Sequence, residues 1–354
     1  MSVQYRPVQW TRSKLVYDLC LAAGASLYVL VYLRWAPGLV EAPLIGGAEL
    51  RMRAFGTCAF WMLTLILCIG PRARLARRFL RVLYNRRHFG VLTFFVAVAH
   101  LYAVLGWYVA FSPTDPWAAL LSANTDTSFL GFPFEWLGLA ALAILFAMAA
   151  TSHDFWLAFL GPPLWKRLHM LVYLAYGLVV MHVTLGVLQA EASAVYAIST
   201  AVSLAAVAGL HLAAGAVEAR RDTIAAVAAD GWIYVARLDE LADGIGRTVT
   251  LPDGERAAVF RHGDKVSALS NACAHQNGPL GEGRIMGGCV TCPWHGFQYD
   301  PETGCAPPPF TEKVATYRLR RDGDRLLIDP RALPPGTRTE PVLIGPVPSG
   351  EAGS

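Results

Sequence analysis

The first two thirds of the chain consist of long apolar segments separated by short polar ones. Six segments are long enough to cross a bilayer about 30 Å thick, given about 1.5 Å of helix per residue. We expect helices, because a helix satisfies its own backbone hydrogen bonds within lipid. The segments lie near residues 14–34, 54–70, 89–111, 133–152, 168–189 and 194–216.

The pattern changes after residue 230. Short alternating runs rich in β-branched and aromatic residues follow one another, separated by turn signals of the Asp-Gly and Gly-Asp kind. The runs are WIYVARL, RAAVFRH, KVSALSN, ATYRLRR and RLLID. They predict a small all-β domain of about 100 residues.

These patterns predict a membrane all-α six-helix bundle over residues 1–216 and, after a linker at 217–230, an all-β domain over 231–333. Residues 334–354 contain many Pro and Gly residues, and we expect a flexible tail there. No internal repeat is evident in the sequence.

Composition and charge agree with a lipid bilayer as the partner of the first part. The 354 residues are 55% hydrophobic and 16% charged, whereas a soluble chain has about 25% charged residues. The net charge of +4 does not suggest nucleic-acid binding, because the Arg residues gather at the ends of apolar segments.

The distribution of Lys and Arg among the loops predicts the orientation. Basic residues are frequent between the second and third segments, between the fourth and fifth, and after the sixth, whereas 112–132 and 190–193 contain none. Arg51 and Arg53 are the exceptions. The positive-inside rule therefore places both termini in the cytoplasm.

The β domain carries two Cys-His pairs. They are Cys273-x-His275 and Cys292-x-x-His295, with 16 residues between them. Two Cys and two His suit zinc, and they also suit a [2Fe-2S] cluster in which two His replace two Cys on one iron. Each pair lies in a Gly/Pro-rich loop between strands, which favours the cluster.

With both ligand pairs, their spacing and the trailing GFQYD, residues 232–330 resemble a Rieske iron-sulfur domain. The resemblance implies that Cys273 and Cys292 hold one iron, and that His275 and His295 hold the other. High-potential members carry two more Cys and a Ser near the cluster. This sequence has Gly278, Trp294 and Phe297 there, and Tyr299 as a hydroxyl donor. We expect a low potential within the roughly −150 to +300 mV range of such clusters.

Four histidines lie in the predicted helices. His88 and His100 belong to the third segment, and His169 and His182 to the fifth, 12 and 13 residues apart. The second member of each pair lies about 18–20 Å further along its helix, so His100 and His182 share one depth, as do His88 and His169. Bis-imidazole haem needs such pairs. Polar contacts between helices are the alternative. His211 lies near the inner depth and is an alternative to His88.

The stretches RRHFGVLTFFVAVAH and WKRLHMLVYLAYGLVVMH resemble the ferric reductase-like transmembrane domain over residues 50–215, in particular the haem-binding membrane subunits of bacterial methionine sulfoxide reductase systems. The resemblance implies b-type haem, one or two, held by the third and fifth helices. His100, His169 and His182 match the family's histidines, and His88 does not. No flavin or nicotinamide module is recognisable.

The expected function is transmembrane electron transfer from a cytoplasmic low-potential Rieske cluster, through b-type haem, to a periplasmic or extracellular acceptor. No catalytic residue is predicted, and enzymatic activity stays open. The donor is a cytoplasmic reductase, a ferredoxin or a quinol. One alternative is a membrane-anchored Rieske ferredoxin or redox sensor that serves a cytoplasmic oxygenase without haem. Another is a quinol oxidase of the cytochrome b and Rieske kind, which requires a high-potential cluster.

Overall fold

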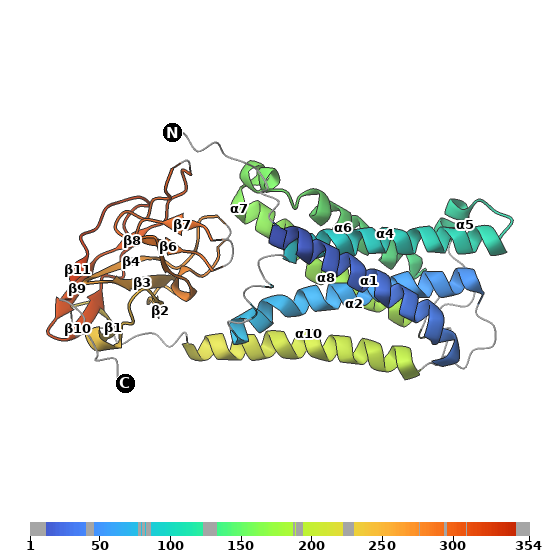
Figure 1. Ribbon diagram of the computed structural model, residues 1–354, viewed down its shortest axis with the longest axis horizontal. Helices are drawn as coiled ribbons and strands as arrows, with labels where there is room; N and C mark the ends of the chain where they lie inside the picture. Colours follow the sequence, from blue (N-terminus) through green and yellow to red (C-terminus); the bar gives the residue numbers. More distant parts are fainter. Residues whose placement is uncertain are drawn as a thin grey trace. The chain divides into compact units, whose positions relative to one another are not determined.

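A computed structural model describes residues 12–39, 46–76, 79, 82, 86–122, 133–186, 188, 194–221, 230–275, 277–293, 296–308 and 310–344. The chain divides into two compact units, residues 7–215 and residues 216–354. The first unit is helical and the second is built from β-strands (Figure 1).

The helical unit contains long apolar helices that run alongside one another (Figure 1). Its helices are α1 (Arg12–Leu39), α2 (Gly47–Leu75), α4 (Arg86–Phe111), α5 (Pro116–Ser122), α6 (Glu135–Ala150), α7 (Asp154–Met170), α8 (Val172–Leu185) and α10 (Ala194–Arg221). Five stretches among the described residues are long and apolar enough to cross a membrane: Leu15–Ala36, Gly47–Leu75, Arg86–Phe111, Leu164–Leu185 and Ala194–Val217. The shorter α6 is also apolar, with 16 residues.

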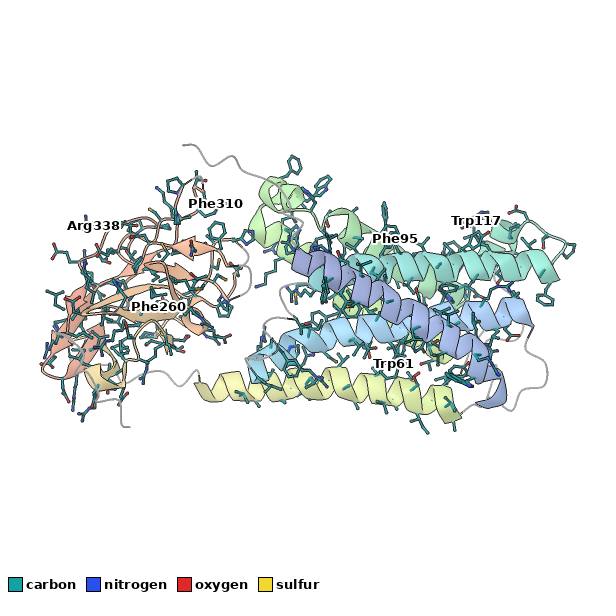
Figure 2. All side chains as sticks on the ribbon, in the orientation of Figure 1. Trp61, Phe95, Trp117, Phe260, Phe310 and Arg338 are labelled. Atoms are coloured by element: carbon teal, nitrogen blue, oxygen red, sulfur yellow. The ribbon has the colours of Figure 1, made fainter. Side chains whose placement is uncertain are left out.

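Many large apolar side chains on the surface of these helices are exposed, as expected for a protein surrounded by lipid. Phe95 of α4 is 60% exposed and Tyr102 is 79% exposed, and Phe95 points outward from its helix (Figure 2). Large apolar surfaces of this kind would aggregate in water. Lipid chains cover them without cost.

Two details differ from the predicted helices. The fifth span begins earlier than residue 168, since α7 starts at Asp154 and a short break at Leu171 separates it from α8. The helix α5 is not predicted by the hydrophobic pattern. Asp115 begins it, because Oδ1 of Asp115 accepts hydrogen bonds from the backbone N–H groups of Trp117 and Ala118 at 3.0 Å.

The centre of the helical unit is largely apolar and contains a group of hydrogen-bonded hydroxyls. Phe60, Leu63 and Leu67 of α2 pack with Ala141 of α6 and Tyr176 of α8. A buried hydroxyl cluster joins three helices, with Oγ of Ser203 lying 2.7 Å from Oγ1 of Thr64 and 2.6 Å from the hydroxyl of Tyr176. Buried hydroxyls need such partners in lipid.

The β domain consists of three small sheets. The strands are β1 (Ile233–Arg237), β2 (Gly246–Thr250), β3 (Arg256–His262), β4 (Lys265–Ser270), β5 (Arg284–Met286), β6 (Cys289–Thr291), β7 (Gln298–Tyr299), β8 (Thr316–Tyr317), β9 (Leu319–Asp322), β10 (Arg325–Ile328) and β11 (Val342–Leu343). The sheet orders are β1-β10-β9, then β11-β4-β3-β2 with β8 also on β4, and β5-β6-β7.

The five predicted strand runs are confirmed as β1, β3, β4, β8 with β9, and β10. The hairpin between β3 and β4 shows why the turn signal is informative. His262 pairs with Lys265 across a two-residue turn, and Gly263 has a φ of 65°, which a side chain would disfavour. Val259, Val266 and Ile328 are fully buried in the core that these strands enclose.

The prediction of a flexible tail from residue 334 is wrong for residues 334–344. β11 pairs with the edge of β4, joining Val342 to Val266, and the N–H of Thr339 donates to the carbonyl of Glu302 at 2.8 Å. The sequence pattern does not reveal this ordered segment, because it is rich in Pro and Gly and its one strand has only two residues. Residues 345–354 lie outside the described part of the chain.

Candidate metal centres

The two predicted thiol ligands lie at neighbouring hairpin loops. Cys273 follows β4, and Cys292 follows β6 at the tip that leads into β7. Their exposed fractions are 1% and 2%, and both belong to a hydrophobic cluster that also contains Leu280 and Val290. The fold thus brings two thiols from separate loops into one apolar environment, where a metal centre would neutralise the two thiolates.

Both loops are shaped by the same kind of backbone turn. The N–H of Asn277 donates to the carbonyl of Cys273 at 2.6 Å, and the N–H of Gly296 donates to that of Cys292 at 3.0 Å. Asn277 and Gly296 have φ values of 56° and 70°. Each loop therefore reverses direction just after its ligand pair, which is how Gly and Asn serve in tight turns.

Aromatic side chains surround the thiols. The hydroxyl of Tyr299 lies 3.3 Å from Sγ of Cys273. Burial raises the pKa of Tyr299 and the neighbouring Cys273 raises it further, so Tyr299 keeps its proton and can donate a hydrogen bond to a thiolate. The ring of Phe297 stacks on His275 with centroids 5.0 Å apart and planes 7° apart. Phe297 thus covers one face of a predicted ligand.

The fourth predicted ligand, His295, lies outside the described residues, as does Trp294. Among the residues that are described, no three His, Cys, Asp or Glu side chains form a complete metal-binding group. The donor set nevertheless fits an iron-sulfur cluster, because the two buried thiols share one apolar cluster, and Phe297, which packs against this cluster, also stacks on His275.

In the helical unit, the structure brings together the two histidines that were predicted to share the outer depth. The rings of His100 on α4 and His182 on α8 have centroids 6.4 Å apart and planes 78° apart. Nδ1 of His100 donates to the carbonyl of Met52 at 2.9 Å, and Nδ1 of His182 donates to the carbonyl of Phe134 at 2.9 Å. Each ring therefore carries a proton on Nδ1, and in its neutral form it has the lone pair on Nε2.

This geometry fits a metal ion held between two imidazoles. Neither Nε2 has a hydrogen bond within the described residues. A metal–imidazole bond is about 2 Å long, so two rings on opposite sides of one metal have centroids on the order of 6 Å apart. A carbonyl on the other ring nitrogen is the usual partner of a metal-ligating His. The pair suits bis-imidazole haem ligation.

The predicted inner pair is not brought together in the same way. Nδ1 of His169 donates to the carbonyl of Trp165 at 3.0 Å, and its Nε2 is buried without a hydrogen-bond partner among the described residues. His169 is therefore suited to bind a metal. Nδ1 of His88 lies 2.9 Å from Oδ2 of Asp18 on α1, a partner that the sequence does not reveal.

His211 has both ring nitrogens engaged. Nδ1 donates to the carbonyl of Val207 at 2.8 Å, and Nε2 lies 3.0 Å from the hydroxyl of Tyr173. The hydroxyl occupies the lone pair that a metal would need. The structure therefore disfavours His211 as the alternative to His88.

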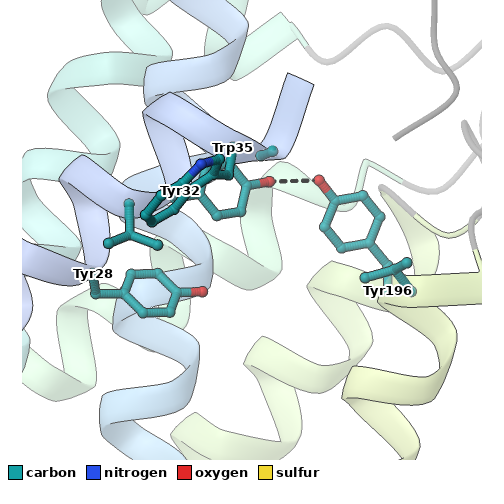
Figure 3. A pocket seen from close by; sticks show the side chains of 7 residues that line it. Tyr28, Tyr32, Trp35 and Tyr196 are labelled. Atoms are coloured by element: carbon teal, nitrogen blue, oxygen red, sulfur yellow. Dashed lines mark hydrogen bonds between the residues drawn. The ribbon is translucent and has the colours of Figure 1, made fainter. Parts of the chain in front are cut away.

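A separate cavity of about 250 Å³ lies between α1 and α10. Figure 3 shows its aromatic lining, in which the hydroxyls of Tyr32 and Tyr196 lie 2.6 Å apart. Tyr28 and Trp35 also line it. It contains none of the predicted ligands.

The two parts of the chain match different families. Residues 231–318 match the Rieske [2Fe-2S] domain family, and residues 55–180 match the ferric reductase like transmembrane component family. The matched ranges contain the four predicted cluster ligands and His88, His100 and His169. His182 and the alternative His211 lie beyond the end of the second range.

Two curated proteins and one solved structure illustrate the similarity. The protein-methionine-sulfoxide reductase heme-binding subunit MsrQ of Caulobacter vibrioides is 31% identical over 169 residues, which are 48% of this chain and 74% of that protein. The ferredoxin component of the naphthalene 1,2-dioxygenase system of Pseudomonas aeruginosa is 31% identical over 101 residues, 28% of this chain and 94% of that protein. The ferredoxin of carbazole 1,9a-dioxygenase from Nocardioides aromaticivorans is 32% identical, covering 28% of this chain and 98% of that one, with a TM-score of 0.27.

Other relatives are matched over a small part of their length. The chain spans 21% of a cholesterol 7-desaturase and 24% of a chloroacetanilide N-alkylformylase oxygenase component. The apolar helices and the two family matches together describe an integral membrane electron-transfer protein. The chain belongs to the ferric reductase-like transmembrane family through its helical part, where it is related to the haem-binding subunit MsrQ, and to the Rieske [2Fe-2S] family through its C-terminal domain.

Proposed function

We propose that this protein conducts electrons across a membrane, between a low-potential Rieske cluster on the cytoplasmic side and an acceptor at the outer face. The observation that carries the proposal is the pair of His100 and His182, whose rings lie 6.4 Å apart in the same chain as a Rieske domain. Haem bound by this pair would carry electrons through the membrane. A helical unit that only anchored the Rieske domain would not need such a pair.

The cluster ligands in this proposal are Cys273, Cys292, His275 and His295. When bound, the [2Fe-2S] cluster and b-type haem would supply one-electron chemistry. The chain contributes the surroundings: buried thiols at 1% and 2% exposure, the Phe297 ring on His275 and the Tyr299 hydroxyl near Cys273. Phe297 stands where high-potential members carry a Ser. This favours a low potential, because fewer hydrogen bonds to sulfur stabilise the reduced cluster less.

His100 and His182 are the proposed haem ligands at the outer depth, acting through Nε2. We propose His169 as a ligand of a second, inner haem, because its buried Nε2 has no hydrogen-bond partner within the described residues. His88 is its proposed partner through Nε2, since Nδ1 is held by Asp18. If the protein binds only one haem, we propose that His100 and His182 hold it.

The proposed topology has six spans over residues 1–216, with α6 as the shortest, and a Rieske domain over residues 231–333. Apart from Arg51 and Arg53, the basic residues lie in alternate loops, which supports cytoplasmic termini by the positive-inside rule. This orientation puts the cluster in reach of a cytoplasmic donor, in the membrane of a bacterium.

The donor in this proposal is a cytoplasmic reductase, a ferredoxin or a quinol. The name of the MsrQ relative, the haem-binding subunit of a methionine sulfoxide reductase, makes a periplasmic or extracellular reductase the proposed type of acceptor. Because no nicotinamide-binding motif is recognisable in the sequence, we propose that a separate electron carrier reduces the cluster.

The proposal is tested by a pyridine haemochrome spectrum and an EPR spectrum of the purified full-length protein. We expect b-type haem bands and a Rieske signal from the same sample. A Rieske signal without haem would leave a membrane-anchored ferredoxin, of the kind that serves an oxygenase, as the function. A high cluster potential would instead favour quinol oxidation.

A further inference from the structure

The surroundings of His100 are repeated around His182. In each case Nδ1 donates to a backbone carbonyl at 2.9 Å, and that carbonyl lies 48 residues earlier in the chain. The acceptors are Met52 of α2 and Phe134 at the start of α6. The helices pack correspondingly, α2 against α4 and α6 against α8.

A glycine lies one helical turn after each acceptor. A β-carbon added to Gly56 would lie 2.9 Å from Cε1 of His100, and one added to Gly138 would lie 3.0 Å from Cε1 of His182. Real β-carbons essentially never lie within 3.0 Å of another atom, as one at Gly56 would, and a contact of 3.0 Å, as at Gly138, is tighter than nine in ten real ones. The positions 52, 56 and 100 therefore recur as 134, 138 and 182, a constant shift of 82 residues.

Other glycines of the same helices have no such neighbour. A β-carbon at Gly70 of α2, at Gly106 of α4 or at Gly177 of α8 would meet nothing within 4 Å. Close approach between a glycine and an imidazole is thus specific to the two histidines. Since glycine weakens a helix relative to alanine, its presence at 56 and 138 has a local cost and calls for a local reason.

We propose that Gly56 and Gly138 are positioning residues for the two haem-ligating histidines. Without a β-carbon, each ring lies directly against the neighbouring helix, where the carbonyl one turn earlier captures Nδ1–H. The hydrogen bond fixes the tautomer and the ring orientation, and it makes Nε2 a stronger electron donor. This inference rests on the outer haem site of the proposed function.

An alanine at either position would push the ring away from its carbonyl acceptor. The clash is slightly worse at Gly56, with distances of 2.9 and 3.0 Å to two ring atoms, than at Gly138, with 3.0 Å to both. Because the two glycines position the two ligands of one haem iron, a substitution at either glycine should disturb the same haem site. We expect the same type of spectral change from both variants, larger at Gly56.

The test compares Gly56→Ala and Gly138→Ala with the control variants Gly70→Ala and Gly106→Ala, all as full-length protein. Haem content, the low-spin EPR signal of bis-imidazole haem and its midpoint potential are measured. We expect haem affinity to fall about 10-fold or more in the two test variants. In the haem that is retained, the potential should rise, because a ring without its carbonyl partner donates less charge to iron.

The Rieske EPR signal reports that each variant is folded, and Gly138→Ala serves as the milder change if Gly56→Ala does not accumulate. Unchanged haem content and potential in Gly138→Ala, or equal losses in the controls, would overturn the inference. If His182→Ala loses haem while the glycine variants keep theirs, the proposed function stands and only the inference fails. If wild-type protein lacks haem, the proposed function itself fails.

Discussion

The hydroxyl of Tyr299, on β7, lies 3.3 Å from Sγ of Cys273 in the loop after β4, within reach to donate a hydrogen bond to a thiolate at this position. Such a bond stabilises the reduced, more negative cluster. Replacing Tyr299 by Phe should lower the cluster potential on the order of 40 mV, since a net hydrogen bond contributes about 1 kcal/mol and a one-electron couple shifts 59 mV per tenfold.

The measurement is an EPR-monitored redox titration. Tyr317→Phe is the matched control, because Tyr317 is also buried, at 4% exposure, but belongs to the core cluster that contains neither thiol. An equal shift in the control, or none in Tyr299→Phe, would mean that the hydroxyl does not act on the cluster.

Phe297 stacks on His275 and contacts the ring of the exposed Phe310, with centroids 4.9 Å apart. Replacing Phe297 by Ala should admit water to the His275 side of the cluster. Water stabilises the reduced state, so the potential should rise and the cluster should be lost faster in air. Phe310→Ala removes only the outer ring and should have a smaller effect. Absorbance decay and redox titration measure both, and a larger effect at Phe310 would contradict the shielding role of Phe297.

His182 and His211 provide a matched pair of membrane histidines. His182 keeps Nε2 without a hydrogen bond in the described part of the chain, whereas Nε2 of His211 faces the hydroxyl of Tyr173. We expect His182→Ala to lose the outer haem signal and to keep the Rieske signal, and His211→Ala to keep both. Optical and EPR titration of the two variants checks this. Haem loss in His211→Ala alone would reverse the assignment.

Glu302 ties the segment 334–344 to the β domain. Its carboxylate lies 3.1 Å from Nζ of Lys265 and 3.0 Å from Nη2 of Arg338, and the hydrogen bond from Lys265 in particular lowers the pKa of Glu302 below its usual 4.5. A lowered folded pKa means that the stabilisation is complete above pH 4.5 and is lost as the pH falls further.

Thermal unfolding between pH 3 and pH 6, followed by cluster absorbance, measures this effect. Glu302→Gln should lose the part of the pH dependence that lies below about pH 4.5. The contribution should stay under about 1 kcal/mol and shrink with salt, because the side chains of Lys265 and Arg338 are 41% and 75% exposed. A pH profile identical to that of the wild type would show that the ion pairs do not stabilise the domain.

The sequence alone predicts the strands of the β domain and the common depth of His100 and His182. Alternation of apolar residues with turn residues at Gly263 and Gly323 locates the strands, since the strand period is two. The rise of the helix alone places His100 and His182 at one depth. The contact between their rings follows once α4 and α8 are neighbours.

Other features depend on contacts that no local pattern reveals. Asp18 is 70 residues from His88, and it is hidden in an apolar segment. Gly56 and Gly138 look like ordinary small residues of membrane helices. The repeated arrangement escapes detection because most residues at positions 82 apart differ, and an isolated glycine and an isolated histidine do not reveal a repeat.

The central claim, electron flow across the bilayer between cluster and acceptor, is tested most directly in sealed proteoliposomes that enclose ferricyanide. Protein oriented with its Rieske domain outward is supplied with a membrane-impermeant reductant on the outside. We expect enclosed ferricyanide to be reduced by wild-type protein and by His211→Ala, and not by His182→Ala or Cys273→Ala. Equal reduction by His182→Ala, or none by wild-type protein that contains both cofactors, would contradict the account.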